Sequence, residues 1–154
     1  MEKGYKIGLI SDTHGLLSEE AVYFLKDADL ILHAGDIGSL EVLERLKELA
    51  PLTAVRGNCD SCHWAENLPE TDMVEIGGHA FYLIHDLEML DLDPKTAEIS
   101  CVVSGHTHEA MSFSRDGVLY VNPGSAGPER YGKTASIACL EIGDGKIKIR
   151  LEKI

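Results

Sequence analysis

The fold is decided by the stretch "YKIGLISDTHGLLSEEAVYFLKDADLILHAGD", residues 5–36. It begins with a short apolar run at residues 5–11 and returns to one at residues 30–35. Between them, residues 18–28 start at Ser18, a good N-cap residue, and carry acidic side chains in the first turn, which predicts a helix. Because a strand, a helix and a second strand follow one another, we expect two parallel strands joined by a right-handed crossover.

The same pattern continues once and then changes. Residues 39–50 repeat leucine at a helical spacing, and residues 52–57 predict a third strand. The second half contains three hairpin signals, centred on Gly77-Gly78, Asp116-Gly117 and Asp144-Gly145. Hairpins require antiparallel strands, so we expect mixed sheets. The sequence predicts one α/β domain over residues 1–154, in which two sheets stack into a sandwich.

Composition narrows the function classes. The chain of 154 residues is 44% hydrophobic and 26% charged, as ordinary globular proteins are. It contains no apolar run of about 18 residues and no signal peptide pattern, so we expect a cytoplasmic protein without a membrane partner. A net charge of −12 disfavours binding to duplex nucleic acid. Cys101 and Cys139 lie in apolar runs and are expected in the core, and disulfides are not expected.

Residues that can bind metal ions follow five of the expected strands. Taken singly, each has an ordinary explanation: aspartates cap turns and helices, Asn58 suits a left-handed position beside Gly57, and His85 could be a core histidine. Open α/β sheets, however, place their ligands at the carboxyl ends of strands. Five strand ends with such residues indicate one shared site, and its candidates are Asp12, His14, Asp36, Asn58, His85, His106 and His108.

Two other motifs carry weaker signals. "CDSCH" (59–63) matches the attachment pattern of c-type haem, but no export signal accompanies it, and a zinc site there lacks a second cysteine pair. "NPGSAG" (122–127) could cradle a phosphate, yet it has no P-loop lysine and no clear helix after it. We interpret it as a turn that leaves a strand and lines the site.

The ordered set "SDTHG", "GD", "GN", a histidine after a strand and "GHTH" resembles the calcineurin-like metallophosphoesterase superfamily. The short chain, with "GNCD" and "GHTH", is similar to its small bacterial and archaeal phosphodiesterase branch. The resemblance covers roughly residues 5–130. It implies a four-layer α-β-β-α sandwich with two mixed β-sheets and a site for two metal ions.

The resemblance also assigns roles to the candidates. Asp12, His14 and His108 would hold the first metal ion, and Asn58, His85 and His106 the second. Asp36 would bridge the two, and Asp36, Asn58 and His85 are the expected catalytic residues. Imidazole mixed with carboxylate suits borderline cations better than Mg²⁺. Mn²⁺ is therefore expected first, with Ni²⁺, Fe²⁺, Zn²⁺ and Mg²⁺ as alternatives.

The implied activity is hydrolysis of a phosphodiester by a hydroxide that the two cations activate. The partner would be a small phosphodiester, possibly a nucleotide, and a homo-oligomer is possible. Larger relatives carry "GNH", where this chain has Cys59, a doubtful acid for a leaving group. Many relatives read "HGH" where this chain reads "HDLEML" from His85 onward. Asp60 is expected either to position a neighbour or to be a solvated turn carboxylate.

A second class of function stays open at this point. The same fold also serves as a non-catalytic scaffold in trafficking complexes, where its metal positions tend to be degenerate. Here all seven positions carry residues able to bind a metal ion. The sequence therefore favours an enzyme over a scaffold.

Overall fold

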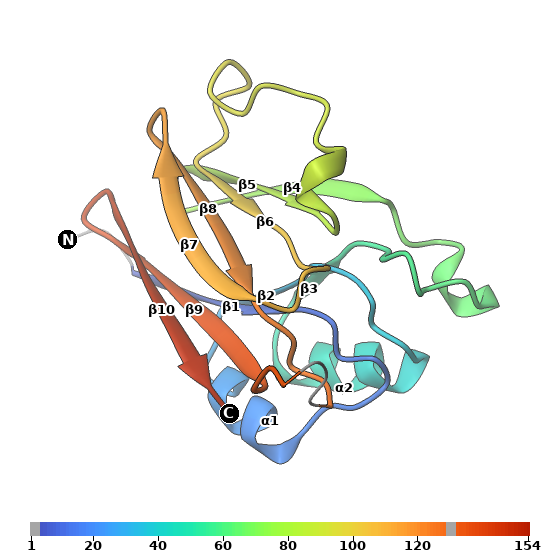
Figure 1. Ribbon diagram of the computed structural model, residues 1–154. Coiled ribbons are helices and arrows are strands. Elements are labelled where there is room, and N and C mark those ends of the chain that lie inside the picture. Colours follow the sequence, from blue (N-terminus) through green and yellow to red (C-terminus); the bar gives the residue numbers. More distant parts are fainter. Residues whose placement is uncertain (1–3, 129–131) are drawn as a thin grey trace.

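The computed structural model, which describes residues 4–128 and 132–154, contains two five-stranded β-sheets that stack on one another, with helices below the first sheet (Figure 1). The first sheet has the strand order β10-β9-β1-β2-β3 and the second β4-β5-β6-β8-β7. The first comprises β1 (Tyr5–Ile10), β2 (Leu30–His33), β3 (Leu52–Ala54), β9 (Ser136–Gly143) and β10 (Lys146–Lys153). The second comprises β4 (Thr71–Ile76), β5 (His79–Ile84), β6 (Cys101–Val103), β7 (Ala110–Arg115) and β8 (Val118–Pro123).

Both sheets are mixed, as predicted. Strands β1, β2 and β3 are parallel, and so are β5, β6 and β8. Each of the three predicted hairpins forms, as β4–β5, β7–β8 and β9–β10. The parallel strands direct their carboxyl ends to one rim of the sandwich, and the strand directions place all three hairpin turns at the opposite end.

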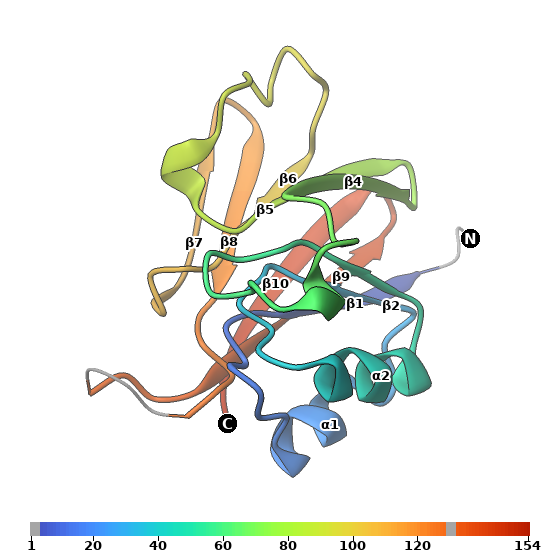
Figure 2. The same cartoon turned by 90° about the vertical axis from the view of Figure 1, so that its right-hand side faces the viewer.

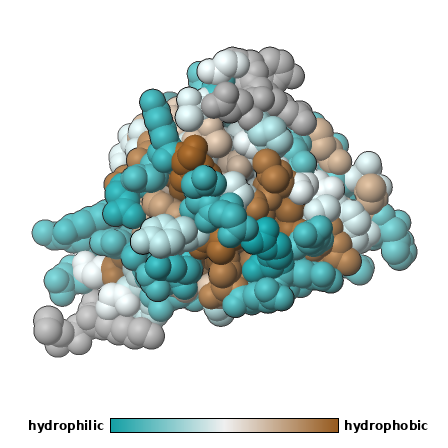
Figure 3. Space-filling model, turned by 90° about the horizontal axis from the view of Figure 1, so that it is seen from below, coloured by the Kyte–Doolittle hydropathy of each residue, from teal (hydrophilic) through white to brown (hydrophobic). Residues whose placement is uncertain are grey.

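Two helices cover the outer face of the first sheet. They are α1 (Glu19–Leu25) and α2 (Leu40–Leu49), and the side chain of Ser18 caps α1 by accepting a hydrogen bond from the Ala21 N–H. Their apolar sides pack on the sheet, and Figure 3 shows that hydrophilic residues predominate on this side of the molecule, with hydrophobic ones between them. In the described residues, no helix is long and apolar enough to cross a bilayer.

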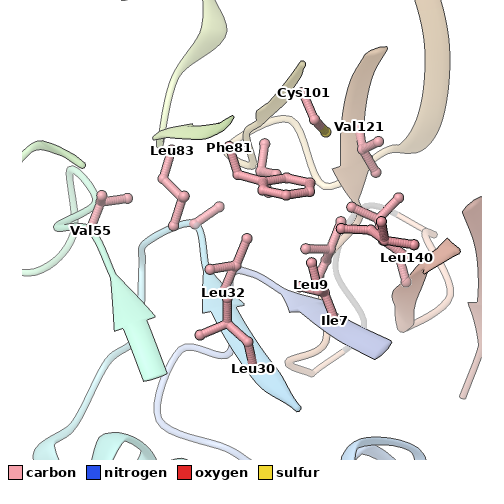
Figure 4. Packing of buried hydrophobic residues seen from close by; sticks show 14 residues of the cluster. Ile7, Leu9, Leu30, Leu32, Val55, Phe81, Leu83, Cys101, Val121 and Leu140 are labelled. Carbon is pink, nitrogen blue, oxygen red and sulfur yellow. The ribbon is translucent and has the colours of Figure 1, made fainter. Parts of the chain in front are cut away.

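The main core lies between the two sheets. Alternate residues of each strand point inward, so Ile7 and Leu9 of β1 meet Phe81 and Leu83 of β5 in the middle of the sandwich (Figure 4). The predicted core position of Cys101 is confirmed, because its side chain is fully buried here. Burying this apolar surface is the main favourable contribution to folding.

The outer face of the second sheet is covered differently. The described residues place no α-helix there; instead residues 86–100 run over it, with one turn of 3-10 helix at Leu87–Met89 (Figure 2). Leucines of this segment pack on Tyr82, Ile84 and Val102 of the sheet. The two-sheet sandwich is as predicted, but its fourth layer is a short acidic segment, since "HDLEMLDLDP" has no helical repeat and ends at a proline.

Candidate metal centre

The seven candidate residues lie together at the rim formed by the carboxyl ends of the parallel strands. Each follows its strand directly or within a few residues, so the rim joins loops from both sheets. The loops after β1, β2 and β3 supply Asp12, His14, Asp36 and Asn58, and those after β5 and β6 supply His85, His106 and His108. This is where an open α/β sheet places its ligand.

A first group of potential ligands contains Asp12, His14 and His108. One donor atom from each lies within 4.8 Å of the others. The Oδ1 atom of Asp12 is 3.3 Å from Nε2 of His108 and 3.8 Å from Nε2 of His14. These three are the residues to which the family resemblance assigns the first metal ion.

A second group contains Asp12, Asp36 and His85, again within 4.8 Å. The Oδ2 atom of Asp36 lies 3.3 Å from Nε2 of His85 and 4.0 Å from Nε2 of His14. Asp36 thus lies within 4.0 Å of a ring nitrogen from each of the two groups. Asp12 also belongs to both groups, which the sequence did not indicate.

Asn58 and His106 complete the second side of the site. The Oδ1 atom of Asn58 is 3.1 Å from Nδ1 of His106, and the rings of His85 and His106 have centroids 5.2 Å apart. Both residues are exposed, whereas Asp12 and Asp36 are buried. The site thus opens to solvent on the side of Asn58 and His106.

The hydrogen bonds of the buried ligands favour a cation between them. The second oxygen of Asp12 accepts bonds from the Ser11 hydroxyl and the His106 N–H, but Oδ1 has no hydrogen-bond donor among the described residues. In His85, Nδ1 lies 2.7 Å from the Ala34 carbonyl and must donate to it, which leaves Nε2 facing the carboxylates. This tautomer is the one that a metal ligand needs.

The rim changes the pKa of its acidic and basic groups. Burial raises the pKa of Asp12 despite the bonds it accepts. Burial acts in the same direction on Asp36, but the contact with His85 and the N–H of Cys59 outweigh it, and the pKa of Asp36 falls well below its ordinary range. Burial lowers the pKa of His85, but Asp36, Asp12 and the Ala34 carbonyl together outweigh it, and the net change is a rise. The carboxylates of Asp12 and Asp36 therefore attract positive charge into the space between the candidate ligands.

Backbone strain is concentrated on these ligands. Eight non-glycine residues of the described chain have positive φ, and five of them are candidate ligands: Asp12, His14, Asp36, His106 and His108. Such conformations cost of order 1–3 kcal/mol and persist where the surrounding structure imposes them, often at functional sites. Asn58 is not among the eight, so the left-handed position considered for it is wrong.

The glycines of the motifs are required by close approach of the loops. A side chain at Gly57 would collide with the backbone and carboxylate of Asp36, and one at Gly105 would collide with Ser11 and Asp12. The "GN" and "GH" glycines therefore allow loops from different strands to touch. Any larger residue would push the ligands apart.

Asp60 joins two of the ligand loops. It is buried, and its carboxylate accepts hydrogen bonds from the backbone N–H groups of Ile37, Gly38 and Gly57 at 2.9–3.1 Å. One carboxylate thus ties the loop after β2 to the loop after β3. Of the two roles considered for Asp60, the solvated turn carboxylate is wrong, and the positioning role is what the contacts describe.

The "NPGSAG" segment joins two other loops. The Asn122 amide donates to the Gly105 carbonyl and the Thr107 hydroxyl, which holds the loop between the two histidines. Ser125 donates to the Asp12 carbonyl, and the N–H of Gly127 also points to it. The segment is the end of β8 and the loop that leaves it, and its hydrogen bonds hold the loops that carry Asp12 and the two histidines.

His33 was missed by the sequence reasoning. It is fully buried behind the rim, where Nδ1 accepts from the Gly35 N–H and Nε2 donates to the Thr13 hydroxyl, which itself donates to the Ile37 carbonyl. Burial, followed by the nearby imidazole of His85, lowers the pKa of His33 to about 3. A neutral His33 therefore connects the loops after β1 and β2.

The cysteine motif separates into two parts. Cys59 is exposed, and its sulfur forms a third group with His14 and Asp36 within 4.8 Å. Cys62 and His63 are exposed and belong to no such group in the described residues. The position that sequence reasoning compared with the histidine of "GNH" thus lies at the site, while neither the haem nor the zinc interpretation of "CDSCH" gains support.

Known proteins resemble this chain over most of its length. A probable metallophosphoesterase of Methanothermobacter thermautotrophicus is 37% identical over 77% of this chain and 76% of its own. A phosphodiesterase of Methanocaldococcus jannaschii is 31% identical over 77% of this chain and 82% of its own. The structure of vacuolar protein sorting 29 from Cryptosporidium parvum has a TM-score of 0.80 over 99% of each chain, but its identity of 22% reports on the fold alone.

The model of the calcineurin-like phosphoesterase superfamily domain matches residues 5–145. This range contains every candidate ligand and all strands of both sheets except β10, which begins at Lys146. With the site geometry and the metallophosphoesterase relatives, the match shows that the chain belongs to the calcineurin-like phosphoesterase superfamily.

Proposed function

We propose that the protein is a phosphodiesterase that uses two divalent cations, with Mn²⁺ as the first choice. The observation that carries the proposal is the buried Oδ1 atom of Asp12, which has no hydrogen-bond donor among the described residues and faces ring nitrogens of His14 and His108. A buried carboxylate oxygen requires a partner. A divalent cation is a partner that both carboxylate and imidazole accept.

The proposal distributes the ligands as the family resemblance implies. One cation would be held by Asp12, His14 and His108 and the other by Asn58, His85 and His106, and Asp36 would contribute to both. The cations, when bound, supply activation of water and of the phosphoryl group. Asp36 is kept in place by the N–H of Cys59, 2.8 Å from its Oδ1, and His85 by the Ala34 carbonyl. These contacts fix the positions of Asp36 and His85, and Asn58 lies on the open side of the site.

A diester substrate is favoured by the residue at position 59. A thiol is a poor acid for a departing alkoxide, so the site suits leaving groups that need no proton from the protein. The Methanocaldococcus jannaschii relative that is named a phosphodiesterase supports this choice. Since the imidazole ligands must be neutral to bind metal, activity is expected to fall when the pH drops below the range in which they titrate.

The test begins with metal-stripped protein. It is reconstituted with Mn²⁺, Ni²⁺, Zn²⁺ or Mg²⁺ and assayed on bis(4-nitrophenyl) phosphate and on 4-nitrophenyl phosphate, while bound metal is counted after dialysis. We expect two ions per chain and faster hydrolysis of the diester, with Mn²⁺ most effective.

The scaffold alternative makes a different prediction. A scaffold would bind few or no ions and hydrolyse neither ester, and Asp36→Asn would then equal the parent in every assay. That result would reject the enzyme. A Cys59→Ala variant tests whether the Cys59 thiol protonates the leaving group. We expect it to lose less activity than Asn58→Ala, because the proposal gives Cys59 no such role.

A further inference from the structure

Two cavities lie beside the candidate metal centre, on the open side of the site. Both are bounded by Asp86 and His106, whose nearest side-chain atoms are 3.8 Å apart. One has a volume of about 490 Å³ and extends over the outer face of the second sheet. The other, of about 610 Å³, includes Asn58 and His85 in its lining. A phosphate at the ligands therefore has space on two sides, as a diester with two ester groups requires.

We name the first of these the aromatic cavity, after its apolar wall. Phe113 of β7 and Tyr120 of β8 are register partners, and their rings stack with centroids 4.8 Å apart and planes within 2°. Met111 and Leu87 add further apolar surface to the lining. Flat aromatic rings and a methionine sulfur are favourable contacts for another planar ring.

The charge of the aromatic cavity limits what enters it. Asp86 and Glu88 line it, and its described lining contains no lysine or arginine. Arg115 lies over the Phe113 ring at 5.5 Å, but it is not part of the lining. Two carboxylates repel additional phosphate groups and accept hydrogen bonds from N–H groups. The cavity therefore suits an uncharged ring and disfavours a polyphosphate chain.

We propose that the aromatic cavity binds a planar ring, such as a nucleobase, on one ester group of the substrate. The inference rests on the proposed function and names its substrate class: phosphodiesters with an aromatic or nucleoside group, in preference to nucleoside polyphosphates. His106 connects the two parts, because it belongs both to the candidate ligands and to the cavity wall. The second ester group extends into the other cavity.

Binding of two probes tests the proposal without requiring catalysis. Manganese-loaded protein is titrated calorimetrically with adenosine 5′-monophosphate and with ribose 5-phosphate, which lacks only the base. We expect the nucleotide to bind at least about 10-fold more tightly, as stacking on an aromatic side chain predicts. Phe113→Leu and Met111→Ala should each remove most of this advantage and leave ribose 5-phosphate unchanged.

A matched control is available on the same sheet. Met73 of β4 is exposed, as Met111 is, but lies outside both cavities, so Met73→Ala should keep the full preference for the nucleotide. Equal affinities for the two probes in the parent, or a preference that survives both Phe113→Leu and Met111→Ala, would overturn the proposal. Because Met111 is exposed, its truncation leaves the fold intact even if Phe113→Leu does not.

A second measurement separates this inference from the proposed function. Metal-free protein is mixed with adenosine, and the ring-proton signals of Phe113 and Tyr120 are followed by nuclear magnetic resonance. Shifts in these signals, together with no ester hydrolysis by the metal-reconstituted protein, would support the aromatic cavity and reject the enzyme. Hydrolysis of diesters with no such shifts and no preference for the base would support the enzyme and reject the aromatic cavity.

Discussion

Aspartates with the same backbone conformation occur at both ends of the sandwich, and the reasons for it differ. At the hairpin end, Asp116 and Asp144 both have φ of 53°, are exposed and precede a glycine in a two-residue turn. At the rim, Asp12 and Asp36 have φ of 54° and 55° but are buried. Asp-Gly is favoured in such turns by local chemistry alone. At the rim the conformation is imposed by contacts between loops, and it directs carboxylates toward one another.

The largest expected difference between the two ends comes from exchanging aspartate for asparagine. Asparagine keeps the size and tolerates positive φ, so the change removes the charge and one acceptor oxygen without altering the shape. Asp36→Asn should weaken Mn²⁺ binding and diester hydrolysis by at least about 100-fold, more than is usual for residues that only support a ligand. Asp144→Asn, the same change at the other end, should alter neither. Calorimetric titration and initial rates measure both variants, and equal behaviour would remove the distinction between the ends.

Removing a support of the rim should have a smaller effect. Asp60→Asn keeps the shape but replaces one acceptor oxygen by an N–H donor group beside the backbone N–H groups of Ile37, Gly38 and Gly57. We expect the free energy of unfolding to fall by about 2–4 kcal/mol and the affinity for Mn²⁺ by about 10–100-fold. Urea unfolding of the metal-free protein and calorimetric titration give the two values.

An exposed aspartate with similar local bonds serves as the control for Asp60. The Asp93 carboxylate accepts from the Lys95 N–H and the Thr96 hydroxyl, away from the rim. Asp93→Asn should change the free energy of unfolding by less than about 0.5 kcal/mol, as surface substitutions do. If Asp60→Asn behaves in the same way, the rim loops are held by other contacts.

His33, which is buried behind the rim, should make the free energy of unfolding depend on pH. Its pKa falls from an ordinary 6.5 to about 3 on folding, mainly because it is buried. Between these values the unfolded chain binds more protons, so the free energy of unfolding decreases as the pH falls, by up to about 1.4 kcal/mol per pH unit. His33→Gln removes this contribution.

The measurement compares urea unfolding of parent and His33→Gln in metal-free form from pH 7 to pH 5. The variant should be less stable at pH 7, by about 1–2 kcal/mol for the altered hydrogen bonds. Its stability should then decline less steeply with falling pH than that of the parent. Parallel curves would mean that His33 is protonated to the same extent in the folded and unfolded chain.

This contrast also explains how far the sequence could predict the molecule. Strands, hairpins and the candidate ligands follow from apolar runs, Asp-Gly or Gly-Gly pairs and polar residues at strand ends, which are features of neighbouring residues. The residues that hold the rim loops together do not follow from such local features. His33 bonds to Thr13 across 20 residues, Asp60 to Ile37 across 23 and Asn122 to Gly105 across 17. No local pattern distinguishes these residues from a core histidine or a turn residue.

The cover of the second sheet was unpredictable for a related reason. Residues 86–100 have leucines at irregular spacing, and their packing on Tyr82, Ile84 and Val102 depends on a sheet formed by distant strands. The aromatic cavity arises from the same arrangement, because Leu87 meets Phe113 and Tyr120 only after the fold has formed. A sequence signal existed in the alternating apolar residues of β7, but it predicted a sheet face and no cavity.

The smallest expected effect tests whether the hairpin end is independent of the rim. Alanine disfavours positive φ, so Asp144→Ala should cost about 1 kcal/mol of unfolding free energy in the β9–β10 turn, measured by urea unfolding. The affinity for Mn²⁺ should not change, since the turn lies at the end of the sandwich opposite the ligands. A loss of metal affinity in this variant would show that strain at one end is transmitted through β9 and β1 to Asp12, and the rim could then no longer be treated as held by its own loops.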